Sequence, residues 1–277
     1  MRRTDPRGGS PPVGRWVLGS VVLLYFGAIL LGPLAALTGE VLSLGPGDIL
    51  RALGRPEALQ ALRMTLTLLI IAVVVNAVVG VAGAIAVVRH RFPGRALVNA
   101  LADLPLAISP VMIGLAFLLL LGRGGWLEPA LNALHLKVVF AFPGVVAANL
   151  FVTLPFTLRE VAYVLDALGT SDEEAAVTLG ASPWQTFWLV TLPNIRLGLG
   201  YGLLMTTARS LGEFGAILVV GGSISGQTQT ATTYIQDAVE ERSLAGAYGM
   251  AALLALVSVC LLLALQWAKA RREEVER

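Results

Sequence analysis

The chain has 277 residues, of which 56% are hydrophobic and only 14% are charged, and its formal net charge is +2. Soluble domains usually carry about a quarter charged residues and expose apolar patches of only a few hundred Å². The composition therefore excludes a disordered chain, an ordinary soluble enzyme and a basic nucleic-acid-binding protein. It favours an integral membrane protein in contact with lipid.

Six stretches are long and apolar enough to cross a membrane. Five carry no charge and the sixth contains Arg209 and Glu213; in chain order they are 16–39, 64–88, 104–122, 138–158, 197–220 and 243–268. A helix needs about 20 apolar residues to span the bilayer core, and it satisfies its own backbone hydrogen bonds there. We therefore predict an all-α, polytopic membrane protein with six transmembrane helices. Its first helix is read as an uncleaved anchor, because it is longer than a signal-peptide core and lacks a clear cleavage site.

The basic residues outside these stretches divide unevenly between the two sides of the membrane. The side that holds both termini carries roughly twice as many Lys and Arg as the other side. The richer side is cytoplasmic by the positive-inside rule. We therefore predict cytoplasmic tails at 1–15 and 269–277.

Residues 171–193, in the longest cytoplasmic loop, have the pattern of two short helices joined by a glycine. Ser171 followed by Glu174 predicts a capping box, and the three acidic residues of this first turn suit the helix dipole. Gly180 stands where a left-handed residue ends a helix of about 8 residues. Two helices this short cannot bury their apolar face against each other. The segment is therefore expected either to dock into a groove of another protein or to pack beneath its own bundle.

The second short helix has its own start and stop signals. Ser182, Pro183 and Gln185 predict a capped helix with proline in its first turn. Trp184 and its aromatic neighbours give this helix an apolar face, and Pro193 is expected to end or kink it.

The string EAAVTLG at 174–180, followed nine residues later by VTLP at 190–193, resembles the EAA loop of ABC-importer permeases. Four further segments resemble the sulfate and molybdate branch of that family, and they look most like its W-type membrane subunit for sulfate and thiosulfate; they lie at 101–115, 124–144, 150–161 and 208–228. The resemblance implies a type I importer fold, with the importer domain over 60–268.

The same resemblance implies the partners. The chain would pair with a second membrane subunit, as a heterodimer or a homodimer, and receive its anion from a periplasmic or lipid-anchored binding protein. Two copies of a cytoplasmic ATPase would bind ATP and Mg²⁺ and supply the energy, so that this subunit is not an enzyme and holds no cofactor or metal. The implied location is the inner membrane of a bacterial cell.

The positions of the lysines independently support ATP hydrolysis by a partner rather than by this chain. The chain has two, Lys137 and Lys269, and neither follows a glycine as the phosphate-binding loop of an ATPase requires.

Carried over residue by residue, the resemblance assigns a coupling role to one set of positions: Glu174, Ala175, Ala176 and Gly180, with Leu192 and Pro193 closing the loop. The small alanines would let the first helix approach the ATPase closely, and Gly180 would set the angle between the two short helices.

Arg209 and Glu213 are four residues apart and are therefore expected on one helical face. Charged residues inside a span line a water-filled path or face the bundle interior. One hypothesis places this pair in the translocation pathway. The favoured one is a structural or gating ion pair, because Glu213 largely cancels the attraction of Arg209 for an anion.

Three alternatives to a sulfate permease stay open. The first is a molybdate or tungstate permease. The second is an ion-coupled secondary carrier that uses Asp103, Arg209 and Glu213. The third is a membrane-assembly protein without transport. Composition does not distinguish sulfate from other substrates, because backbone N–H groups at helix ends can hold an oxyanion without any charged side chain.

Overall fold

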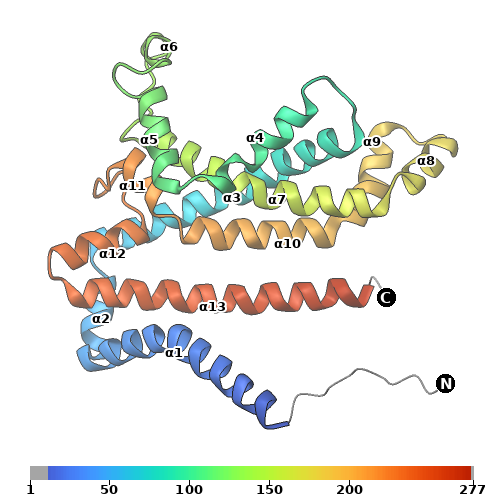
Figure 1. The fold of residues 1–277 in the computed structure, drawn as a ribbon. Helices are drawn as coiled ribbons and strands as arrows, with labels where there is room; N and C mark the ends of the chain where they lie inside the picture. The colour runs from blue at the N-terminus through green and yellow to red at the C-terminus, as the bar shows by residue number, and fades with distance from the viewer. Residues whose placement is uncertain (1–11, 276–277) are drawn as a thin grey trace.

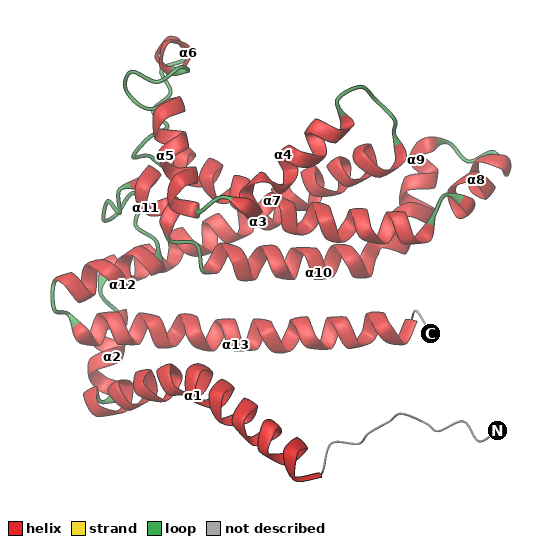
Figure 2. Ribbon diagram, viewed as in Figure 1, coloured by secondary structure: helices red, strands yellow, loops and turns green. Residues whose placement is uncertain are grey.

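A computed structural model describes residues 12–275, in which every regular element is a helix (Figures 1 and 2). The helices in the first half of the chain are α1 (Pro12–Leu44), α2 (Pro46–Leu53), α3 (Pro56–Arg89), α4 (Arg95–Ala107), α5 (Pro110–Leu121) and α6 (Glu128–Ala133). The second half forms α7 (Phe142–Leu168), α8 (Ser171–Thr178), α9 (Pro183–Thr186), the π-helix η1 (Phe187–Thr191), α10 (Leu192–Leu211), α11 (Gly215–Gly221), α12 (Ala231–Glu240) and α13 (Leu244–Val275). Of the two predicted tails, residues 1–11 and 276–277 lie outside the described part.

Four helices are long and apolar enough to span a membrane singly, at Trp16–Leu44, Pro56–Arg89, Phe142–Leu168 and Leu244–Ala264. Two bent pairs bring the spans to 6, and they correspond to the third and fifth predicted spans. The pair α4–α5 is bent by 118°, and the helix Pro183–Leu211 meets α11 at 57°. The prediction of six spans is therefore confirmed, although two of them are broken helices.

The break in the third span has a local cause. Ile108 and Ser109 both adopt extended backbone angles between α4 and α5. Ser109 precedes Pro110, and a residue before proline is pushed out of the helical region by the proline ring. The chain therefore turns sharply: α5 packs on α11 and α7, and α6 lies beyond the end of α5 (Figure 1).

The interior of the bundle is the contact between α3, α7 and α10, where small residues let the helices approach closely. A Cβ atom added at Gly202 of α10 would lie 3.0 Å from the Cα of Thr157 on α7. Buried polar pairs cross the same contact: the Asn76 amide donates to the Thr153 hydroxyl at 2.8 Å, and the Thr157 and Thr206 hydroxyls lie 2.9 Å apart. Small residues and interhelical hydrogen bonds of this kind hold helices together in lipid, where the hydrophobic effect is absent.

The two ends of the bundle carry different elements. At one end lie α8 and α9, and the C-terminal end of α13 points the same way; α2 and α12 lie at the opposite end (Figure 1). We call these the α8 end and the α12 end. The first helix, α1, packs on α13 and α2 and leaves most of its apolar side chains exposed. This exposure is the expected state of a helix whose solvent is lipid.

Candidate functional site

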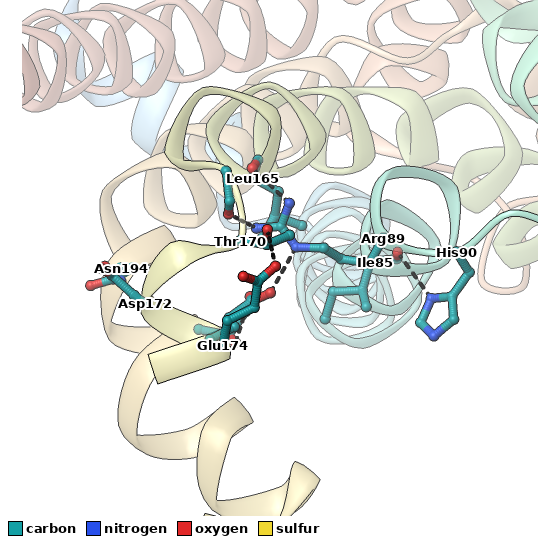
Figure 3. Close-up of polar contacts among 11 residues, drawn as sticks. Ile85, Arg89, His90, Leu165, Thr170, Asp172, Glu174 and Asn194 are labelled. Atoms are coloured by element: carbon teal, nitrogen blue, oxygen red, sulfur yellow. Dashed lines mark hydrogen bonds and ion pairs between the residues drawn. The ribbon is translucent and has the colours of Figure 1, made fainter. Parts of the chain in front are cut away.

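The segment 171–193, here called the EAA hairpin, begins with α8. Ser171 is the first helical residue and Thr170 is the N-cap, so the predicted Ser171–Glu174 capping box is wrong. The helix starts one residue early because the left-handed Gly169 ends α7 and Thr170 already accepts the first helical bond, from the Glu174 N–H at 2.9 Å. The Glu174 carboxylate instead accepts from the Thr170 hydroxyl at 2.7 Å (Figure 3). The predicted acidic first turn is confirmed.

The turn between the two short helices is as predicted. Gly180 has φ +89°, and its N–H donates to Val177 O at 2.9 Å, while the Ala181 N–H donates to Ala176 O at 3.0 Å. Such bonds satisfy the carbonyls at the end of α8 and require a left-handed residue at the glycine. The cap of α9 is also confirmed: Ser182 and Gln185 exchange backbone-to-side-chain hydrogen bonds, and Pro183 lies in the first turn.

Pro193 does not end the helix, because α9, η1 and α10 follow one another without a gap from Pro183 to Leu211. The π-helix Phe187–Thr191 explains why. Here the Leu192 N–H donates to Phe187 O, five residues back, which widens the turn just before the proline. A wide turn accommodates the missing N–H and the ring of a proline that would break a regular α-helix, and such turns are also places where helices kink. The predicted helix end is therefore wrong, whereas the kink stays a prediction; Leu192 and Pro193 are both the last residues of the EAA hairpin and the first of α10.

The base of the EAA hairpin is tied to the bundle by Arg89, the last residue of α3. Its guanidinium donates to the Glu173 carboxylate at 2.8 Å, to Leu165 O at 3.0 Å and to Gly169 O at 2.6 Å (Figure 3). Glu173 also accepts from the Thr191 hydroxyl at 2.9 Å. One side chain thus joins α3, the end of α7 and α8.

The tip of the EAA hairpin exposes apolar side chains. Leu179 is 89% exposed and Trp184 is 70% exposed, and α8 has no buried residue. Of the assigned coupling residues, Glu174, Ala175 and Gly180 are exposed and Ala176 is half-buried. Within residues 12–275, the bundle therefore does not cover this face, contrary to the alternative in which the hairpin packs beneath its own bundle.

Arg209 and Glu213 form an ion pair of 2.6 Å. They do not share a helical face, because α10 ends at Leu211 and Glu213 lies in the break before α11. Glu213 is buried, and its second carboxylate oxygen accepts the Ala216 N–H at 2.9 Å. The Glu213 carbonyl accepts from the Thr232 hydroxyl of α12 at 2.8 Å. The pair thus lies at the bend of the fifth span, where it connects α10, α11 and α12.

Asp103, cited above for a secondary carrier, is held by a different pair. Its carboxylate accepts from the Arg159 guanidinium at 2.6 Å, and Arg159 also bonds the side chain and carbonyl of Asn99. These contacts fasten α4 to α7. Asp103 therefore lies apart from Glu213 in the fold, on a different helix and with a different arginine.

Sequence reasoning missed two contributors to these sites. Arg89 was counted only as a cytoplasmic charge, and its acidic partner lies 84 residues away. Thr232 lies in α12, in a polar stretch of the sequence that gave no local signal for a contact with Glu213. Both contacts depend on how distant helices pack, which no motif near either residue reports.

Comparisons with known proteins agree with this architecture. Residues 77–273 match the model of the family described as "Binding-protein-dependent transport system inner membrane component". The chain is 44% identical to the sulfate transport system permease protein CysW of Synechococcus elongatus, over 86% of this chain and 84% of that protein. It is 34% identical to the corresponding CysT protein of Escherichia coli K12, over 90% of each.

A solved structure shares the fold. It is a bacterial alginate ABC transporter in complex with its pentasaccharide-bound periplasmic protein, which superposes with a TM-score of 0.75 at 18% identity and covers 94% of this chain and 95% of that one. The family match, over residues 77–273, extends over most of this chain. The chain therefore belongs to the family of binding-protein-dependent transport system inner membrane components.

Proposed function

We propose that this chain is the W-type permease subunit of an ATP-driven sulfate or thiosulfate importer in a bacterial inner membrane. The substrate rests on the CysW and CysT relatives, which are sulfate transport system permease proteins. The partners would be a CysT-like second permease, two copies of a cytoplasmic ATPase and a binding protein on the outer side. Both termini and the α8 end would then be cytoplasmic, in accord with the positive-inside count.

One observation carries the coupling role: the apolar tip of the EAA hairpin is uncovered while its base is fixed. Leu179 and Trp184 protrude, and Arg89 holds the acidic helix α8 to the bundle. A rigid element with an exposed apolar face is the form expected of a helix that enters a groove on a partner. The partner would be the ATPase, because neither lysine of this chain lies in a phosphate-binding loop.

The fifth span provides a route from the ATPase to the membrane. Because η1 leads directly into α10, a displacement of the docked hairpin would be passed to α10. Its far end meets α11 at the Arg209–Glu213 pair, and Thr232 connects that point to α12. ATP-driven closure of the ATPase pair would tilt this helix and change access from one side of the membrane to the other.

Reconstitution with the second permease, the ATPase and the binding protein tests the proposal. We expect sulfate-loaded binding protein to stimulate ATP hydrolysis and sulfate uptake, and Trp184→Ala to lower both at least tenfold. Trp126→Ala is the matched control, because Trp126 is 88% exposed but lies between α5 and α6, far from the EAA hairpin. Equal coupling in the two variants would contradict the docking role.

The same preparation separates the alternatives. Stimulation by molybdate or tungstate in place of sulfate would assign the chain to the molybdate branch. Uptake that collapses with a protonophore and ignores ATP depletion would identify a secondary carrier. Copurification without any ATPase would favour an assembly protein.

A further inference from the structure

A cavity of about 270 Å³ lies at the α12 end, between the first turns of α3, the start of α7 and the loop that joins α11 to α12. Its walls carry polar side chains and one full charge: Gln60, Arg63 and Thr67 come from α3 and Gln227 and Gln229 from the loop, and Phe142 of α7 completes the lining. The α3 residues recur at helical spacing, so that they form one face. The loop between α11 and α12, drawn in Figure 2, supplies the opposite wall.

Arg63 is the charged residue that lines this cavity, and it has no counter-charge. In the part of the chain that the structure describes, its guanidinium makes neither an ion pair nor a hydrogen bond. Elsewhere in the described chain, Arg51 is paired with Asp48 and Arg159 with Asp103. A guanidinium fork with free donors binds planar or tetrahedral oxyanions bidentately.

Two further features favour an anion beside Arg63. The cavity reaches the N-terminus of the 27-residue helix α7 at Phe142, where the helix dipole is positive. Gly226 has φ +77°, and a Cβ there would lie 3.2 Å from the Gln60 side-chain oxygen. A glycine thus brings the loop, and with it the Gln227 amide, close to the α3 face.

The carboxylate that Gln229 contacts is already hydrogen-bonded twice. Asp237 accepts from the Ser223 hydroxyl and from the Gln229 amide, each at 2.6 Å. It lines the neighbouring cavity of about 510 Å³, together with Glu57, Glu241 and Arg55. The two cavities meet at Gln229 but differ in charge: the smaller holds a lone cation and the larger is mostly acidic.

We propose that the smaller cavity is an encounter site for the transported anion, a tetrahedral divalent oxyanion held by Arg63 and by the amides of Gln60 and Gln227. This assignment rests on the proposed function and adds an entry point at the α12 end, where the binding protein would release its cargo. An anion held there lies next to α12, which Thr232 joins to the bend of the fifth span.

Equilibrium binding of radiolabelled sulfate to the assembled permease–ATPase complex, in nanodiscs of neutral lipid and without binding protein, tests the site. We expect Arg63→Gln to weaken binding at least tenfold and Arg63→Lys to weaken it less, because lysine keeps the charge but loses the fork. Raising the ionic strength should weaken binding to the wild type more than to Arg63→Gln, since salt screens the exposed cation. Arg55→Gln is the matched control, as Arg55 lines the acidic cavity.

Several results would overturn the site. They are no sulfate binding by the wild-type complex, equal affinity in wild type and Arg63→Gln, or an equal loss in Arg55→Gln. Lipid phosphate offers the same chemistry, so the assay is repeated with anionic lipid; abolished sulfate binding there would assign the site to a headgroup and overturn it as well. Folding is checked by size-exclusion profiles. Sulfate uptake by the wild-type transporter is a separate measurement, so a failed site and a failed function give different results.

Discussion

The α3–α7–α10 contact and the EAA hairpin differ in burial: the contact is buried, whereas the tip of the hairpin is exposed. In the contact, glycines let the helices approach closely, and threonine and asparagine side chains form hydrogen bonds across it. Thr157 and Thr206 are fully buried there. The hairpin is open: Leu179 and Trp184 protrude, and only its base is bonded to the bundle. Stability thus resides in the contact, whereas the exposed tip is the surface that the proposed docking would cover, and variants in the two regions should separate stability from coupling.

The largest loss of stability is expected for Gly202→Val. The added side chain meets the backbone of α7 at Thr157, which cannot move aside without separating the helices. Overpacking of this kind costs about 3 kcal/mol and lowers Tm in detergent. Gly200→Val on the same helix is the control, because nothing lies within 4 Å of a Cβ at Gly200. A similar Tm for both variants would contradict the claim that close packing of α10 on α7 at Gly202 stabilises the bundle.

Arg89→Ala comes next. It leaves the Glu173 carboxylate and the carbonyls of Leu165 and Gly169 without their charged donor. Loss of charge-assisted hydrogen bonds of this kind costs about 2 kcal/mol, and the EAA hairpin should detach from the bundle. Thermal unfolding and protease sensitivity within 171–193 measure the effect. Arg91→Ala, at an exposed arginine two residues away, should change neither.

Gly180→Ala should have a smaller and local effect. The methyl group meets nothing within 4 Å, so its cost is only that of holding an L-residue at φ +89°, about 1–2 kcal/mol. Hydrogen exchange at the Ala181 amide, which bonds Ala176 O, should quicken while exchange in α7 stays unchanged. Gly180→Asn should be milder, because asparagine tolerates the left-handed region. If alanine and asparagine gave the same rates, backbone strain would not be the cause.

Leu179→Ser should leave stability within about 0.5 kcal/mol of wild type, since the side chain is already 89% exposed. Its affinity for the ATPase should nevertheless fall about tenfold or more, because a leucine that is buried on docking contributes about 2 kcal/mol. Titration of the ATPase against the detergent-solubilised permease measures this. A drop in Tm without loss of affinity would reverse the roles of the two regions.

Much of this architecture followed from the sequence because its causes are local. The lengths of the apolar runs predicted six spans, and the glycine and serine signals predicted the turn at Gly180 and the cap at Ser182. Orientation and the coupling residues remain predictions that binding and uptake experiments have to decide.

The errors arose at backbone irregularities that the residue pattern does not report and at contacts between distant segments. Pro193 reads as a helix end, yet the π-turn before it lets the helix continue. Arg209 and Glu213 read as one helical face, yet the helix ends between them and the ion pair forms across the bend. The contacts of Arg89 and Thr232 connect segments that are remote in sequence. The sequence around each of these two residues does not predict its contact.

The length of α10 has a mechanical consequence. At 1.5 Å per residue its 20 residues form a rod of about 30 Å, so a tilt of about 5° around one end moves the other by about 3 Å. That displacement is comparable to the Arg209–Glu213 distance of 2.6 Å at the far end of α10. A small tilt applied at the η1 end is therefore expected to be enough to break this ion pair.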